Sequence, residues 1–172
     1  ELADGWLGTS FTPEHADAHL RHLAVGAAKS GRSLADLDLC VGVAVGFAAD
    51  PEPFLRQRKA SLAFTLGAMG SASANFYNEA YRRGGYEDAA LEVQRLWLAG
   101  RRDEAAARVP DELVLRTSML GSEAAVRARI RCYRAAGITT LRLDPLGETP
   151  AARLDTLGRA VELVRAECEA AA

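Results

Sequence analysis

Cysteine is scarce in this sequence, and the three cysteines, Cys40, Cys132 and Cys168, lie far apart. Their odd number and wide spacing match neither a disulfide framework nor the closely paired cysteines of a structural metal site. These features exclude a disulfide-stabilised secreted domain, and we expect a reducing, cytoplasmic setting.

Long apolar runs are also missing. No run approaches the roughly 18 residues of a membrane-spanning helix, and no basic segment precedes an apolar, signal-like stretch. The net charge at pH 7 is only −2, so the chain has no long-range attraction to nucleic acid or to an anionic membrane. The absence of a GxGxxG turn argues against a nicotinamide site of the Rossmann type. We therefore expect a small-molecule ligand.

The residues that are present are sufficient for one folded domain. The 172 residues are 49% hydrophobic and 26% charged, a balance that allows a buried core. The first residue is Glu1 rather than methionine, and the opening residues have the pattern of a helix end running into a strand. We therefore expect the chain to be part of a longer protein.

Three segments have the pattern of strands, and helical segments separate them. Ala3 to Leu7 is a short candidate, Leu39 to Ala48 is a continuous apolar run, and Ile138 to Leu143 precedes an Asp-Pro turn. The apolar run predicts a strand buried on both faces of a parallel sheet, where Gly42 and Gly46 allow close approach of a backbone or ligand. The alternation predicts an α/β fold. Three strands are too few for a complete barrel, which takes about 250 residues.

Helical patterns fill the rest of the chain. Thr12 is expected to cap a helix over residues 13–31, and a long helical section is expected over residues 51–121. Two more helices are expected over residues 122–136 and 150–166. The first of these two carries arginines that we interpret as an ordinary exposed face, namely Arg127, Arg129, Arg131 and Arg134.

Aromatic residues concentrate in one stretch, from Phe64 to Tyr86, which holds five of the eleven in the chain. Gly67 and Gly70 are expected to interrupt a helix there. Ser71 or Ser73 is expected to cap a new helix directly afterwards.

This new helix carries an unusual combination of side chains. Asn75, Asn78 and Arg82 fall at i, i+3 and i+7 and share one face, and Tyr77 and Tyr81 form an aromatic stripe beside them. A phosphate or a planar ring could dock on this surface. Alternatively, the aromatic side chains belong to the core and the amides cap helices or face solvent.

His15, His19 and His22 also share one helical face, with a spacing that could bind a metal. No carboxylate or cysteine cluster accompanies them, and the same spacing arises on the solvent side of any amphipathic helix. We therefore expect no metal site.

Several separate motifs resemble one known family. They are ELADGWLGTSFTPEH, LCVGVAVGF, FTLGAMGS, NFYNEAYRRGGYED, VPDELV, LGSEAAVRARI and YRAAGITTLRLDP. Together these motifs, which span nearly the whole chain, resemble the C-terminal half of luciferase-like monooxygenase family proteins. The likeness is closest to the actinobacterial branch that uses the deazaflavin coenzyme F420.

The resemblance implies a fold. The family has a TIM (β/α)8 barrel, of which residues 1–172 would be the C-terminal part, with about three strands and a helical insertion over residues 51–121. The strand at Asp4 would then be the sixth of the barrel, that at Leu39 the seventh and that at Ile138 the eighth. Strands one to five would be absent.

The resemblance also implies site residues at the barrel mouth. Thr9 and Ser10 would lie near a phosphate or the substrate, although a helix cap alone is an equal alternative. Trp6 and Phe11 would contact the substrate or pack beneath the insertion. Asp144 would contact the substrate or cap the turn at its strand end.

On the insertion, Asn75, Tyr77, Asn78 and Arg82 would contact the coenzyme or substrate. Sugar-phosphate dehydrogenases of the family place a lysine in the loop that here contains Gly8 to Thr12, so a phosphorylated sugar is disfavoured. No residue is assigned as the catalytic acid or base.

The implied function is hydride transfer between coenzyme F420 and a small organic substrate. One alternative is an FMN-dependent monooxygenase of the same family. The other is a non-catalytic, truncated half-barrel that serves in binding or assembly. An open sheet edge would need a cover, so we expect a homo-oligomer or a separate segment that supplies the missing strands.

Overall fold

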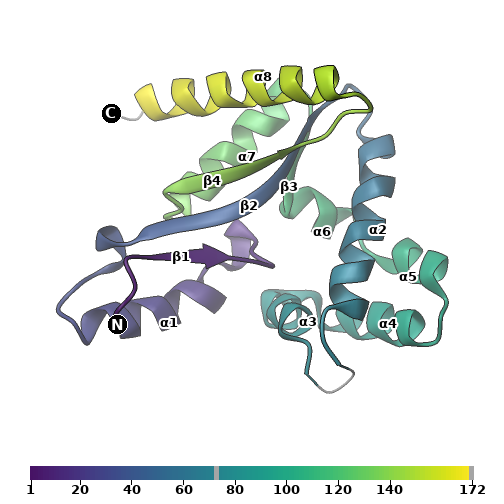
Figure 1. Ribbon diagram of the computed structural model, residues 1–172, viewed down its shortest axis with the longest axis horizontal. Helices are drawn as coiled ribbons and strands as arrows, with labels where there is room; N and C mark the ends of the chain where they lie inside the picture. The colour runs from purple at the N-terminus through teal and green to yellow at the C-terminus, as the bar shows by residue number, and fades with distance from the viewer. Residues whose placement is uncertain (72–73, 171–172) are drawn as a thin grey trace.

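The computed structural model describes residues 1–71 and 74–170 and contains a parallel sheet of four strands (Figure 1). The strands are β1 (Gly5–Gly8), β2 (Asp38–Phe47), β3 (Ser118–Gly121) and β4 (Thr140–Pro145). The α/β fold class and the parallel sheet predicted from the sequence are confirmed. The short strand β3 is an addition, since its residues were expected to belong to the helical section.

Strand β2 is the centre of the sheet, because each of the other strands pairs with it. One edge of β2 carries β1 beside Asp38 to Val41 and β3 beside Ala44 to Phe47. The other edge carries β4, in a register that sets Ala44 opposite Asp144. Among the described residues, the outer edges of β1 and β4 have no partner strand.

The two faces of β2 differ. Its branched residues, Leu39, Val41, Val43 and Val45, are buried in a core with helices α7 (Glu123–Ala135) and α8 (Pro150–Glu169). The alternate positions on the opposite face are occupied by the small residues Gly42, Ala44 and Gly46. Gly42 is exposed, so the prediction that this strand is buried on both faces is wrong at that position.

The remaining helices lie beside β1 and beside the C-terminal end of β2 (Figure 1). A short 3-10 turn, η1 (Pro13–His15), and α1 (Asp17–Ala28) follow β1, and a second turn, η2 (Leu34–Asp36), precedes β2. Helices α2 to α6 gather beside the C-terminal end of β2: α2 (Glu52–Ala68), α3 (Phe76–Tyr81), η3 (Arg82–Tyr86), α4 (Glu87–Leu98), α5 (Arg102–Arg108) and α6 (Asp111–Arg116).

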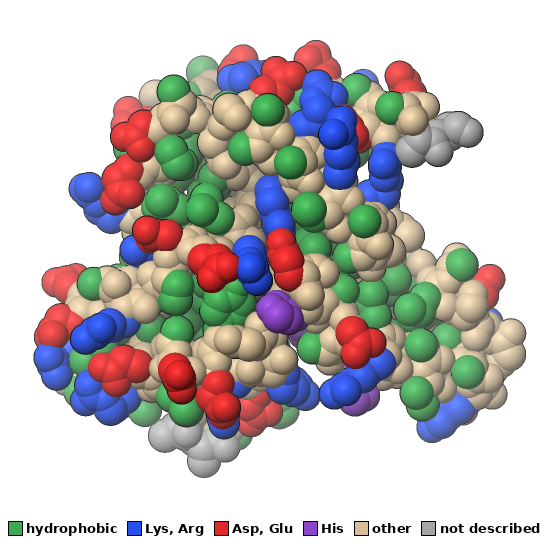
Figure 2. Space-filling model, turned by 180° about the vertical axis from the view of Figure 1, so that it is seen from behind, with side chains coloured by type: hydrophobic (Ala, Val, Ile, Leu, Met, Phe, Trp, Pro, Cys, Tyr) green, Lys and Arg blue, Asp and Glu red, His purple; other side chains and the backbone are tan. Residues whose placement is uncertain are grey.

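These helices share a second core, which includes Leu62, Leu66, Val93, Leu96 and Leu113. Figure 2 shows acidic and basic side chains intermixed over the face that it displays. Among the described residues, no helix combines the length and the apolarity needed to cross a bilayer.

Two predictions of local structure are wrong. Gly67 does not interrupt α2, because it lies inside the helix, where a Cβ would come within 2.3 Å of Trp97 on α4. Its missing side chain therefore permits close packing of two helices. Thr12 precedes the turn η1 and makes no side-chain capping bond, so the regular helix begins only at Asp17.

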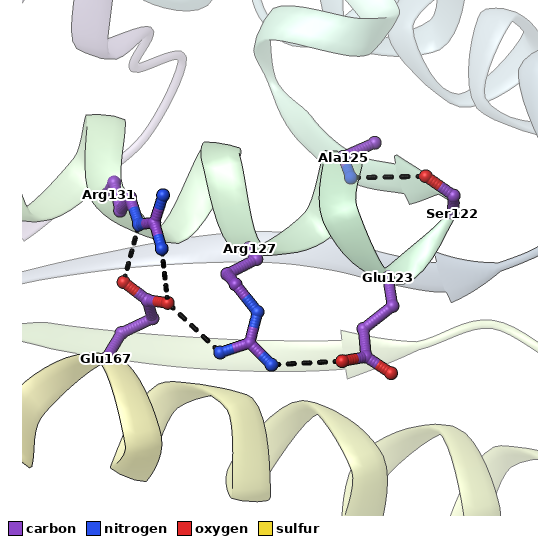
Figure 3. Close-up of polar contacts among 6 residues, drawn as sticks. All are labelled: Ser122, Glu123, Ala125, Arg127, Arg131 and Glu167. Carbon is purple, nitrogen blue, oxygen red and sulfur yellow. Dashed lines mark hydrogen bonds and ion pairs between the residues drawn. The ribbon is translucent and has the colours of Figure 1, made fainter. Parts of the chain in front are cut away.

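The arginines of α7 lie at the surface as we expected, with Arg131 and Arg134 exposed and Arg127 and Arg129 half-buried. They also bind groups on other segments. The Glu167 carboxylate on α8 is only 5% exposed and accepts hydrogen bonds from Arg131 (2.7 and 3.0 Å) and Arg127 (3.1 Å). Arg127 also donates to Glu123 (2.9 Å), as Figure 3 shows. Arg129 binds Glu14 of η1. The ion pairs on Glu167 join α7 to α8.

Figure 3 also shows the N-cap of α7, where Ser122 Oγ accepts a hydrogen bond from the Ala125 amide. This cap satisfies one of the amides that a helix start leaves unpaired. It fixes the start of α7 directly after β3.

The ion pairs on Glu167 predict a pH-dependent stability. Hydrogen bonds from Arg131 and then Arg127 lower the pKa of Glu167 from 4.5 to about 2. When folding lowers the pKa of a carboxylate, that carboxylate stabilises the folded state at pH values above its unfolded-state pKa. This stabilisation is lost as the pH falls through the folded-state pKa. We expect Glu167→Gln to be less stable than wild type at pH 7, with the difference shrinking between pH 4.5 and 2 in urea unfolding.

The matched control is Glu169→Gln, which alters an exposed carboxylate on the same helix. This variant should follow the wild-type curve at every pH. A difference between Glu167→Gln and wild type that stays constant down to pH 2 would contradict the assignment.

Candidate functional site

A cavity of about 280 Å³ lies where β1 ends, beside the later halves of β2 and β4. The loop after β1 forms one wall with Gly8, Thr9, Ser10 and Phe11. The small-residue face of the sheet forms the floor, with Arg142 and Asp144 of β4. Helices α2 and α3 form the opposite wall, with Arg58, Leu62, Thr65, Tyr77 and Tyr81.

The loop after β1 is held in an unusual conformation. Ser10 has a φ of 53°, in the left-handed region that side chains other than glycine seldom adopt. Its Oγ is buried, with no hydrogen-bond partner of good geometry among the described residues. Such strain and an unpaired buried hydroxyl are both common at binding sites.

Arg142 reaches across the sheet because β2 carries a glycine opposite it. A Cβ on Gly42 would lie only 2.7 Å from Arg142 Nη2, so the guanidinium occupies the space that a side chain would take. Arg142 and Asp144 are alternate residues of β4 and therefore share this face. We predicted that Gly42 allows a backbone or a ligand to approach closely. In the structure, the group that approaches is the Arg142 side chain.

Arg58 enters from the opposite wall, on α2. Its Nε is buried and has no hydrogen-bond partner in the described residues. Tyr81 lies nearby, and burial raises the pKa of its hydroxyl to about 12 although the Ser10 hydroxyl and the Arg58 charge oppose the shift. Tyr81 is thus a neutral hydrogen-bond donor at physiological pH.

The structure brings together five of the predicted site residues around this cavity, namely Thr9, Ser10, Phe11, Tyr77 and Asp144. Trp6 does not line the cavity. Its indole lies across Gly8 and packs against Phe11 and His19, with ring centroids 5.9 and 5.5 Å apart.

Asn75 and Asn78 lie outside the cavity, where their amides bind the backbone. Asn75 Nδ2 donates to the Leu66 carbonyl (2.9 Å), and Asn78 Nδ2 donates to the carbonyls of Leu66 (3.0 Å) and Ala90 (2.8 Å). Asn75 Oδ1 accepts from the Asn78 amide, so Asn75 is the cap of α3. The prediction of Ser71 as this cap is wrong, and Ser73 lies outside the described residues.

Arg82 also lies away from the cavity, because it forms an ion pair with Glu87 (2.7 Å). His15 and His19 lie against aromatic rings, and the three histidines do not gather around a common point. His19 contacts Trp6 and Phe11, burial lowers its pKa, and His15 packs against Tyr86. In residues 1–71 and 74–170, no three His, Cys, Asp or Glu side chains gather to hold a metal.

Sequence reasoning missed the two arginines of the cavity. For Arg142 a signal exists, since it alternates with Leu141 and Leu143, which pack into the core with α7 and α8. A charged residue between two core positions must face the other side of the sheet. For Arg58 no such signal exists, because a surface arginine on a helix has the same pattern.

The bonds of Asn78 predict a structural role. Asn78→Ala would remove the side-chain donor of the Ala90 carbonyl and one of the two amide donors of the Leu66 carbonyl, at a cost of about 2 kcal/mol. Glu79→Ala, at an exposed position of the same helix, should cost less than about 0.5 kcal/mol. Urea unfolding of both variants measures the difference. Equal stability with a selective loss of ligand binding would instead support the coenzyme contact predicted from the sequence.

Comparisons with known proteins agree on one family. The profile of the family described as Luciferase-like monooxygenase matches residues 1–140. The chain is 36% identical over 143 residues to a Mycobacterium tuberculosis protein named "Putative coenzyme F420-dependent oxidoreductase", covering 82% of this chain and 41% of that protein.

A solved structure shares the fold. It is a coenzyme F420-dependent tetrahydromethanopterin reductase from Methanopyrus kandleri, with a TM-score of 0.67 and 23% identity. The match covers 95% of this chain and 44% of the reductase. The chain therefore spans less than half the length of both relatives, and its sheet matches part of a barrel. By its sequence profile, its relative and its fold, the chain belongs to the luciferase-like monooxygenase family.

Proposed function

We propose that this chain forms part of an oxidoreductase that transfers a hydride between coenzyme F420 and a small organic substrate. The observation that carries the proposal is the 36% identity, over most of the chain, to a relative named for F420 dependence. The cavity supports it, because a C-terminal barrel mouth is where enzymes of this architecture place their chemistry.

The residues of the cavity fit a planar coenzyme. Gly42 and Ala44 add no large side chains to the floor, which Arg142 shares, and Tyr77 stands on the opposite wall. Ser10 and Tyr81 offer hydroxyl groups that can donate to a ring carbonyl. When bound, the deazaflavin supplies the hydride chemistry. The chain's own residues would orient the ring and exclude water, with Leu62 contributing an apolar surface.

We further propose that the chain is the C-terminal part of the barrel, with residues 51–121 as an insertion that covers the mouth. Strands β1 and β4 each have an outer edge without a partner in the described residues. Because an unpaired parallel edge needs a cover, further strands would come from an N-terminal segment of the same protein or from a partner copy.

An FMN-dependent monooxygenase is the second candidate, favoured by the description of the family whose profile matches. Both coenzymes present a planar ring system to the same floor. The choice between them is therefore a question of relative affinity.

A fluorescence titration of the chain with F420 and with FMN tests the proposal. We expect micromolar binding of F420 and weaker binding of FMN. Tyr77→Ala should weaken F420 binding about tenfold, because an aromatic wall is worth about 1–3 kcal/mol in stacking. Phe76→Ala is the matched control, because Phe76 is 77% exposed on the same helix, and it should bind like wild type.

Sedimentation must show that each variant remains folded. Tighter binding of FMN would support the monooxygenase instead. A folded chain that binds neither coenzyme would contradict the proposal and favour a non-catalytic binding module.

A further inference from the structure

We propose that the cavity binds the carboxylate of a small organic acid between Arg58 and Arg142. If the proposed function holds, the substrate is therefore an anion. The binding step itself does not depend on that function, because it requires only the two guanidinium groups and the hydroxyl groups beside them.

The first argument is the lack of partners for both arginines. In the described part of the chain, no carboxylate oxygen lies within 4.0 Å of a nitrogen of Arg58 or Arg142, whereas other arginines such as Arg131 form close ion pairs. The Nε of Arg58 is buried and also lacks any hydrogen-bond acceptor. A buried donor without a partner destabilises the fold, and a ligand oxyanion would remove that cost.

The second argument is that the two hydroxyl groups beside the arginines, those of Ser10 and Tyr81, can donate hydrogen bonds. Ser10 Oγ is buried and has no hydrogen-bond partner of good geometry among the described residues, although the Tyr81 hydroxyl lies beside it. The Tyr81 hydroxyl keeps its proton because burial raises its pKa to about 12. An acceptor-only group such as a carboxylate matches two guanidinium groups and two hydroxyl groups.

The third argument concerns how Arg142 is held. Its guanidinium lies over Gly42, so the side chain extends along the floor of the cavity toward β2 rather than away from the sheet. The glycine thus positions the charge inside the cavity.

The net charge of the cavity and its apolar walls favour an organic monoanion. Asp144 also lines the cavity, so the formal charge of its three ionised side chains is +1. A carboxylate balances this net charge, whereas a dianion such as phosphate would leave the cavity with an excess of negative charge. The apolar walls formed by Phe11, Leu62 and Tyr77 suit the organic part of such an acid.

Benzoate is a suitable probe, and benzyl alcohol is its uncharged counterpart. Isothermal titration calorimetry of the chain should show benzoate binding at least tenfold tighter than benzyl alcohol, and inorganic phosphate binding more weakly than benzoate. Arg142→Gln and Arg58→Gln should each weaken benzoate binding about tenfold and leave the affinity for benzyl alcohol unchanged. Arg56→Gln, which changes an exposed arginine outside the cavity on the same helix as Arg58, is the control and should bind like wild type.

Arg58→Lys keeps the charge and covers the case in which Arg58→Gln does not fold; it should retain most of the preference for benzoate. Equal binding of benzoate and benzyl alcohol would overturn the proposal, as would equal losses in Arg56→Gln and Arg142→Gln.

A titration with F420 shows whether the two arginines bind an acidic substrate or an anionic group of the coenzyme. If Arg142→Gln weakens F420 binding but not benzoate binding, the arginines hold the coenzyme, and the proposal of an acidic substrate is overturned. If the chain binds benzoate but does not bind F420, the result supports the anion site and contradicts only the proposed function.

Discussion

The packing of β2 is the constraint on which the rest of the structure depends. Its branched residues fill the core under α7 and α8, and they can do so only if the alternate residues face the other way. Those alternate residues are small, so the second face of the strand has room for side chains from other elements. Arg142 lies over Gly42, and Phe54 of α2 lies over Gly46. The same alternation therefore builds one core and leaves space for the cavity.

The cavity is lined by residues of both cores, such as Val43 and Leu62, and by polar groups that lack partners among the described residues. On α7 and α8, arginines and carboxylates are paired, and the amides of α3 are bound to backbone carbonyls. At the cavity, Arg58 and Ser10 keep buried polar atoms without partners. Among the described residues, buried polar atoms without a partner also occur at Tyr86, Ser118 and Arg129, which do not line the cavity. Those of Arg58 and Ser10 do line it, so a ligand bound there can pair with them.

Much of the fold could be predicted from the sequence, because strands and helices follow from local periodicity. The run around Val43, the helices and the parallel arrangement were predicted correctly, as was the family. The four residues of β3 are too few to give a periodic signal, and they are a strand only because they pair with β2.

The site was predictable only in part. The loop with Thr9 and Ser10 follows a strand, where a site is expected. The roles of Asn75 and Asn78 depend on where the Leu66 carbonyl lies in space, and sequence spacing cannot show this. The position of Arg58 likewise depends on how α2 packs against α4, α5 and α6 beside the sheet.

The most direct test of this account is a coenzyme titration of Gly42→Val, combined with its thermal unfolding. Valine favours strands, and its Cβ would displace only the flexible end of Arg142, so the stability should change by less than about 1 kcal/mol. The new side chain would stand on the floor of the cavity and displace the arginine. The account predicts a folded variant whose affinity for F420 is at least tenfold lower than that of the wild type, and an unchanged affinity would contradict it.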